Sequence, residues 1–234
     1  MVLTVEKVKM QTPVIRNASS VIIIRKDNVL PSVLMGQRGK SAVFMPNKFV
    51  FPGGAVDQSD FEVSLISKPD DICLRRLKEY SNISNTQAFL SAAIREVWEE
   101  TGLMFGSPAN DKQSVSSKLQ WKSFSELGLA PCAKDFRFIF RAITPPQRTR
   151  RFDARFFLVD AKRIIGDLDD FSKASDELSH LKWFTFSEAR KLDLPFITEI
   201  VLAEAEAQME NIGCPLSVPF FNNTTEKSEF IRIH

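Results

Sequence analysis

Residues 95–103 read Arg-Glu-Val-Trp-Glu-Glu-Thr-Gly-Leu, and three glutamates fall within five consecutive positions of this stretch. In a helix, Glu96, Glu99 and Glu100 stand at i, i+3 and i+4 and therefore share one face. Like charges at this spacing destabilise a helix by roughly 0.2–0.5 kcal/mol per pair. A divalent cation held between the carboxylates reverses the sign of that effect, and oxygen ligands suit Mg²⁺ or Mn²⁺. The stretch predicts a metal site on a helix.

The residues before this stretch have a helical pattern. Apolar side chains recur every four residues at Phe89, Ala93 and Val97, which places them on one face of a helix. Residues 84–87 read Ser-Asn-Thr-Gln, which has the form of a capping box at a helix start. Gly102 is a typical C-terminal stop. We expect a helix that starts near residue 84 and runs to residue 101.

The remaining patterns predict a chain of the α/β class. Short β-branched or alternating runs indicate strands at 20–25, 29–37, 135–144, 155–160 and 230–233. The first two of these follow one another closely, so a hairpin is the simplest pairing. Helices are expected at 187–192 and 195–210, with one or two shorter helices between 57 and 83 around a break at 68–70.

A glycine turn lies well before the acidic helix, where residues 51–54 read Phe-Pro-Gly-Gly. The two glycines allow backbone shapes and close contacts that a Cβ would block. Such a turn can offer a carbonyl oxygen to a metal ion. A lone Gly-Gly pair is more often a tight turn without chemistry, but the acidic helix downstream favours a site here.

Together these motifs resemble the Nudix family. Residues 95–103 match the second half of the Nudix box, R-E-U-x-E-E-x-G-U with U apolar, and Gly53-Gly54 resembles the glycine pair that opens it. The resemblance implies an α/β/α sandwich with a mixed β-sheet. It also implies a pyrophosphohydrolase, an enzyme that cuts a diphosphate bond joining a nucleoside to another group with the help of Mg²⁺ or Mn²⁺.

The resemblance also assigns roles to residues. The metal ligands would be the carbonyl oxygen of Gly53 together with Glu96, Glu99 and Glu100. Arg95 would orient Glu99, which is our first choice for the general base, and Glu100 would share in catalysis. Glu177 lies in an acidic segment of the kind common late in Nudix domains, and it is the second choice for the base or a further metal ligand.

The match to the box is interrupted. The usual box places a Glu eight residues before its Arg, where this chain has Gln87, and a Gly fourteen residues before it, whereas Gly54 precedes Arg95 by 41 residues. An insertion of 27 residues, at about 57–83, therefore splits the box, and it could be a packing cover or a lid over the substrate. Split boxes are familiar in the branch of Nudix proteins that resembles the peroxisomal coenzyme A diphosphatase.

This partial resemblance favours coenzyme A or an acyl derivative as the substrate. The L-R-x-H-x-G-Q segment of microbial coenzyme A pyrophosphatases is missing, however. ADP-ribose, dinucleoside polyphosphates and nucleotide sugars therefore stay open. A non-catalytic Nudix module that senses a nucleotide is an alternative from another class, although a pure binder has no need to keep both Glu99 and Glu100.

Arginines outside the box are candidates for substrate binding. Arg38 follows a predicted strand, and Arg148, Arg150 and Arg151 follow a Pro-Pro pair between two others. The guanidinium fork matches phosphate geometry, so these side chains could hold a substrate phosphate. A solvated turn is the alternative for each of them.

Length and composition bound the remaining expectations. A chain of 234 residues predicts one domain over 1–234, with the insertion at about 57–83 and a C-terminal helix and tail at about 195–234. A net charge of +2 gives no sign of a nucleic-acid partner, and no run is long and apolar enough for a membrane helix. The expected partner is a small nucleotide diphosphate, and a homodimer is open because Nudix proteins are often dimers.

Cysteine usage and the chain start favour the cytoplasm. Cys73, Cys132 and Cys214 are odd in number and lack C-x-x-C spacing. We expect free thiols in a reducing compartment. The chain opens with neither a signal-peptide nor a transit-peptide pattern, so a cytoplasmic location is the default expectation.

Overall fold

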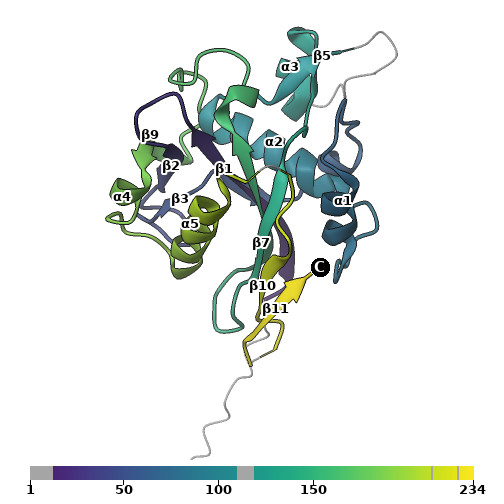
Figure 1. Ribbon diagram of the computed structural model, residues 1–234, viewed down its shortest axis with the longest axis vertical. Coiled ribbons are helices and arrows are strands. Elements are labelled where there is room, and N and C mark those ends of the chain that lie inside the picture. The colour runs from purple at the N-terminus through teal and green to yellow at the C-terminus, as the bar shows by residue number, and fades with distance from the viewer. Residues whose placement is uncertain (1–12, 110–118, 212, 226) are drawn as a thin grey trace, which may run out of the picture.

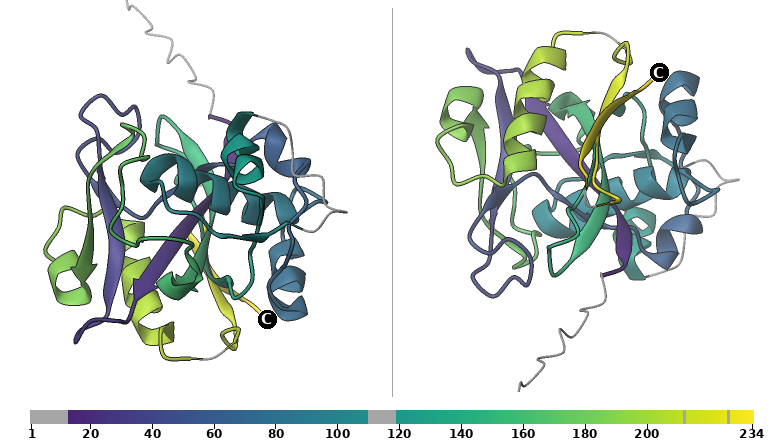
Figure 2. Two further views of the ribbon diagram at one scale, coloured as in Figure 1. Left: turned by 90° about the horizontal axis from the view of Figure 1, so that it is seen from above. Right: turned by 90° about the horizontal axis from the view of Figure 1, so that it is seen from below.

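A large mixed β-sheet between helices forms the body of the protein in the computed structural model, which describes residues 13–109, 119–211, 213–225 and 227–234 (Figure 1). Helices α1 (Asp71–Lys78) and α2 (Gln87–Thr101) cover one face of the sheet, and α4 (Phe186–Ala189) and α5 (Phe196–Gln208) lie on the other. The further views in Figure 2 show the same layers. The predicted α/β/α sandwich is confirmed.

Nine strands of the described chain make up the main sheet, in the order β11-β10-β7-β8-β1-β2-β3, with β4 added to β1 and β9 added to β2. The bounds are β1 (Ile15–Arg25), β2 (Ser32–Arg38), β3 (Phe49–Val50), β4 (Gly53–Ala55), β7 (Arg137–Ile143), β8 (Arg151–Asp160), β9 (Leu178–Thr185), β10 (Val218–Asn222) and β11 (Glu229–Ile233). The β1–β8 and β7–β10 pairs are parallel, and the other pairs are antiparallel.

The central strand β1 divides two hydrophobic cores. Its Val21 and Ile23 pack with α1 and α2, whereas Ile22 and Ile24 pack with α5. All four side chains are at most 2% exposed. A strand covered on both faces needs a continuous apolar run rather than an alternating one, which explains the sequence of this segment.

The insertion is a packed part of the fold. It contains the 3₁₀ turn η1 (Gln58–Phe61) and α1, and Asp70 caps α1 by accepting a hydrogen bond from the Cys73 N–H at 2.8 Å. Leu65, Cys73 and Leu77 belong to the same buried core as α2 and β7. Among the two roles predicted for the insertion, this burial supports the packing cover.

Smaller elements lie between α2 and β7 and after β8. They are β5 (Gly106–Pro108), η2 (Leu119–Trp121), α3 (Lys122–Glu126), β6 (Leu129–Pro131) and η3 (Ala161–Arg163). β5 and β6 form a separate two-stranded sheet. In the part of the chain that the structure describes, no helix is long and apolar enough to cross a membrane.

Two local predictions differ from the structure. The predicted capping box at 84–87 is wrong, because α2 begins at Gln87 behind Thr86, whose side chain makes no capping hydrogen bond. The segment 218–222, placed in a tail by its sequence, forms β10 and pairs with β7. The predicted stop at Gly102 is confirmed, since this residue ends α2 with a φ of 74° in the left-handed region that favours glycine.

Candidate active site

The glycine corner lies where β4 pairs with the middle of β1. Gly53 and Gly54 stand opposite Ser20 and Ser19 in an antiparallel ladder. A Cβ added to Gly53 would overlap the carbonyl oxygen of Ser19, and a Cβ added to Gly54 would overlap the carboxylate of Glu96. Both positions require glycine because backbone and carboxylate atoms occupy the space of a side chain.

Glu100 meets the same corner from α2. Its Oε2 accepts a hydrogen bond from the N–H of Gly53 at 2.7 Å, and the residue is only 2% exposed. The structure therefore brings Glu96 and Glu100 against the glycine corner. Gly53 makes its contact to Glu100 through its amide, and the role of its carbonyl oxygen as a metal ligand stays a prediction.

Arg95 is the centre of the hydrogen-bond network. Its Nη1 donates to Oε1 of Glu96 at 2.9 Å and to Oε2 of Glu99 at 2.8 Å. Its Nη2 donates to the carbonyl oxygen of Ala55 at 2.9 Å, and its side chain is 5% exposed. Arg95 thus fixes two of the three glutamates relative to β4, and one of these is Glu99, the residue it was predicted to orient.

The remaining partner of Arg95 is Asp60 of the insertion, which our sequence analysis missed. Oδ1 of Asp60 accepts from Nε of Arg95 and Oδ2 accepts from Nη2, both at 2.9 Å. The side chain of Asp60 is fully buried. A two-point pairing of this kind holds both the position and the plane of the guanidinium.

The spacing of the box could have identified Asp60. In an uninterrupted box the Glu follows the Gly by six residues, and Asp60 follows Gly54 by six. The position eight residues before Arg95 is instead Gln87, which lies in the first turn of α2. The insertion therefore interrupts the box after its first acidic position, and the carboxylate that pairs with the box arginine is retained as Asp60.

Arg38 and Glu177 flank the site at the facing ends of β2 and β9, where Arg38 pairs with Leu178. After burial, the charge of Glu96 and the Gly53 hydrogen bond, the charge of Arg38 lowers and that of Glu177 raises the pKa of Glu100, so both charges act on the site. Nε of Arg38 is buried and finds no hydrogen-bond partner among the described residues. An unpaired buried donor of this kind suits an anion that the protein does not itself supply.

Burial controls the proton affinity of the three glutamates. Burial raises the pKa of Glu96 to about 7, with Arg95 opposing and the charges of Glu99 and Glu177 adding to the rise. Burial likewise raises the pKa of Glu99. Burial and then the charge of Glu96 raise the pKa of Glu100 well above its ordinary range. The carboxylates repel one another in a poorly hydrated site, and a cation would relieve this repulsion.

The residues of the site fit a divalent cation in their donor chemistry. Within the described ranges, no three acidic, histidine or cysteine side chains converge closely enough to hold a metal ion as they stand. The donors offered are carboxylate oxygens, which Mg²⁺ and Mn²⁺ prefer. Arg95 engages one oxygen each of Glu96 and Glu99, so the second oxygen of each is the candidate ligand. Metal binding stays a prediction.

The structure separates the members of the predicted arginine cluster. Arg151 is 3% exposed, and it donates to the carbonyl oxygens of Thr144 at 2.9 Å and Asn223 at 2.5 Å. Its fork is therefore committed to the backbone. Arg148 and Arg150 are exposed on the loop between β7 and β8, so they are the members of the cluster that a ligand can reach.

Two curated proteins with similar sequences are both named as hydrolytic enzymes. The chain is 29% identical to the Caenorhabditis elegans protein named "Putative nudix hydrolase 7" over an alignment of 177 residues that covers 72% of this chain and 50% of that protein. It is 26% identical to "Acyl-coenzyme A diphosphatase NUDT19" of Xenopus laevis, with 67% of this chain and 53% of that protein covered. The chain thus spans about half the length of these curated relatives. No protein-family model matches it.

A solved structure is similar to this chain as well. The NUDIX hydrolase from Alicyclobacillus acidocaldarius superposes with a TM-score of 0.64 at 25% identity, covering 86% of this chain and 98% of that one. The fold, the split box and these relatives make the chain similar to Nudix hydrolases. One of the relatives is named as an acyl-coenzyme A diphosphatase.

Proposed function

We propose that this chain is a metal-dependent pyrophosphohydrolase that cuts a diphosphate bond between a nucleoside and another group. The observation that carries the proposal is the packing of Glu96 and Glu100 against the glycine corner, with Glu96 and Glu99 fixed by Arg95. Phosphoryl chemistry needs positioning and charge stabilisation more than new covalent groups. A rigid face of carboxylates beside an unpaired arginine donor supplies both.

The carboxylates of Glu96, Glu99 and Glu100 would hold Mg²⁺ or Mn²⁺. A bound divalent ion neutralises the substrate phosphates and lowers the pKa of a bound water. The chain's own contribution is to place the ligands on one turn of α2 and to lock them through Arg95 and Asp60. The buried mutual repulsion of the carboxylates raises their affinity for a cation.

Glu99 is the proposed general base. Its side chain is 36% exposed, compared with 12% for Glu96, so a water molecule has more access to it. Glu177 is exposed beside the same site and is the second choice.

Arg38 is the proposed contact to a substrate phosphate close to the cleaved bond. The support is its unpaired Nε and the effect of its positive charge on the pKa of Glu100. Arg148 and Arg150 would hold a more distant phosphate of the substrate. Arg151 would support this loop through its bonds to the backbone.

Coenzyme A or an acyl derivative is the proposed substrate, cut to phosphopantetheine and 3′,5′-ADP. The support is the split box and the relative named as an acyl-coenzyme A diphosphatase. ADP-ribose and other nucleotide diphosphates form the alternative class. The contacts of Arg95 hold the carboxylates that would act on the diphosphate, and they do not select the group attached to it.

A substrate panel tests the proposal. Coenzyme A, acyl-coenzyme A, ADP-ribose, dinucleoside polyphosphates and nucleotide sugars are incubated with Mg²⁺ or Mn²⁺, and products are separated by chromatography. Glu99→Gln should fold normally and lose about 10²–10⁴-fold in rate, while Glu199→Gln, an exposed change on α5, should keep full rate. Near-wild-type rates in both Glu99→Gln and Glu100→Gln would reject the mechanism. Binding without turnover by the unaltered chain would assign a nucleotide sensor instead.

A further inference from the structure

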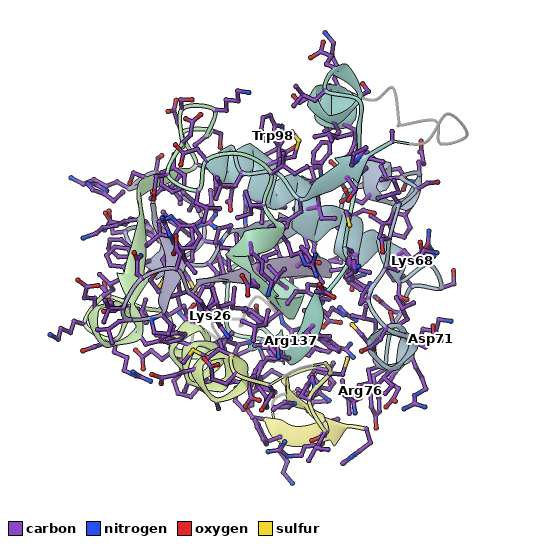
Figure 3. The ribbon with its side chains drawn as sticks, turned by 45° about the horizontal axis from the view of Figure 1, so that its top comes forward. Lys26, Lys68, Asp71, Arg76, Trp98 and Arg137 are labelled. Atoms are coloured by element: carbon purple, nitrogen blue, oxygen red, sulfur yellow. The ribbon has the colours of Figure 1, made fainter. Side chains whose placement is uncertain are left out.

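Helix α1 of the insertion holds the segment that leads into β10. Arg76 is 6% exposed, and its Nη1 and Nη2 donate to the carbonyl oxygens of Pro215 at 2.5 Å and Leu216 at 2.7 Å. Figure 3 shows Arg76 where α1 approaches the C-terminal strands, and the C-terminus lies beside α1 in Figure 2. The insertion and the C-terminal segment are therefore in direct contact, although about 140 residues separate them in sequence.

Two of the three cysteines meet at this contact. Oδ1 of Asp70 accepts a hydrogen bond from the Cys73 N–H at 2.8 Å and from Sγ of Cys214 at 3.1 Å. One oxygen atom thus touches both residues. The Cys214 side chain, followed by burial, raises the pKa of the Cys73 thiol, in line with this shared contact. Cysteines that are distant in sequence are neighbours in the fold.

The two thiols differ in access. Cys73 is fully buried, with its Sγ 3.9 Å from the carbonyl oxygen of Phe136, whereas Cys214 is partly exposed. Cys132 is also partly exposed, but its backbone joins Phe105 and Ser67 instead. An oxidant from solvent can therefore reach Cys214, and the nearest thiol to resolve the product is Cys73.

We propose that Cys73 and Cys214 are a site of reversible oxidation, at which a hydroperoxide converts the two thiols into a disulfide that ties α1 to the segment before β10. Sulfur of Cys214 attacks the peroxide O–O bond and becomes a sulfenic acid while one water leaves. Sulfur of Cys73 then attacks that sulfur, the S–S bond forms, and a second water leaves. Two thiols and one hydrogen peroxide give one disulfide and two waters, and a dithiol reductant reverses the change.

The disulfide would stiffen the contact that Arg76 already makes. A cross-link that closes a loop of about 140 residues removes much conformational freedom from the unfolded chain. The melting temperature of the oxidised protein should rise by roughly 5–10 °C. Amide exchange should slow in α1 and in β10, because local opening of either would have to break the tie.

The test uses the full chain, reduced and then treated with dilute hydrogen peroxide. Remaining thiols are alkylated, and peptides are analysed by mass spectrometry without reduction. We expect a linked peptide containing Cys73 and Cys214, one free thiol at Cys132, and a rise in melting temperature that dithiothreitol reverses. Cys132→Ser should behave in the same way, and Cys214→Ser should show neither the link nor the rise.

Three results would overturn the inference. These are a link that involves Cys132, further oxidation of Cys214 to a sulfinic acid while Cys73 stays a thiol, and alkylation of all three cysteines after peroxide treatment. Cys214→Ser is preferred to a change at fully buried Cys73, since it alters a partly exposed side chain. Circular dichroism of the reduced variant verifies that it folds.

Discussion

Asp60→Asn tests the finding that the insertion supplies the partner of Arg95. Oδ2 of Asp60 accepts from both Arg95 Nη2 and the Asp57 N–H, at 2.9 and 2.7 Å, while Oδ1 accepts from Arg95 Nε alone. The asparagine amide has one oxygen and one donor group, so the oxygen should take the Oδ2 position. Its NH₂ then faces the Nε–H of Arg95, and two donors oppose each other in a buried place.

The expected cost follows from this geometry. Removing one partner of a buried ion pair typically costs 3–5 kcal/mol, but Arg95 keeps its bonds to Glu96 and Glu99. We therefore expect a loss of about 2–3 kcal/mol in the free energy of unfolding and a fall of roughly 5–10 °C in melting temperature. The rate should drop by roughly 10–100-fold, because a tilted guanidinium misplaces the glutamates.

Thermal denaturation followed by circular dichroism, together with the diphosphate assay, measures both effects. Asp57→Asn is the matched control. Its side chain caps the same 3₁₀ turn but does not bond to Arg95, so its cost should stay near 1 kcal/mol. Gln87→Ala should leave the rate unchanged. If Gln87→Ala lowers the rate and Asp60→Asn does not, the box position belongs to Gln87 and our assignment of Asp60 is wrong.

Three further predictions rest on individual contacts. Gly54→Ala should displace the Glu96 carboxylate and lower the rate at least about tenfold. Gly39→Ala should have no effect on the rate, because an added Cβ there would meet only Oγ of Ser41, at an ordinary contact distance of 4.0 Å. In the metal-free protein, the raised pKa of Glu96 contributes stability below pH 4.5, and this stability is lost as the pH rises through about 7. Melting temperatures measured in EDTA should fall over this pH range. Mg²⁺ should raise the melting temperature more at about pH 8 than at about pH 5. Asp153→Asn should lower the free energy of unfolding by about 3–5 kcal/mol in a denaturant titration, because it removes the negative charge that pairs with the buried guanidinium groups of Arg141 and Arg155.

Local signals were enough to predict the helix of the site. Apolar residues at four-residue spacing and a stop at Gly102 are properties of adjacent positions, and α2 follows them. The hairpin of β1 and β2 is also local. By contrast, β10 pairs in parallel with β7 across about 80 residues of chain, and parallel pairing leaves no turn signal between the strands. Its residues were therefore predicted as a tail.

The site shows the same division. Glu96, Glu99 and Glu100 share a face because of helix geometry, which sequence spacing reports directly. Their contact with the glycine corner needed the resemblance to a family, since 41 residues separate Gly54 from Arg95. Asp60 was missed because the insertion separates the two halves of the box. The box position counted forward from Gly54 is Asp60, whereas counted back from Arg95 it is Gln87. The unpaired Nε of Arg38 and the approach of Cys214 to Cys73 of the insertion depend on tertiary packing, which the sequence does not encode locally.

The position of Asp60 also bears on how a split box can arise. Removing residues 61–87 would join Asp60 to Ala88 and place Arg95 eight residues after an acidic side chain, which is the spacing of an uninterrupted box. The segment 61–87 is thus inserted at one point of the box, and the residues on either side of it keep the spacing of an uninterrupted box. The same segment also buries Cys73 and Leu77 in the core and, through Arg76, binds the backbone of Pro215 and Leu216. Its removal would therefore restore the spacing of the box and at the same time take away the support of the segment that leads into β10.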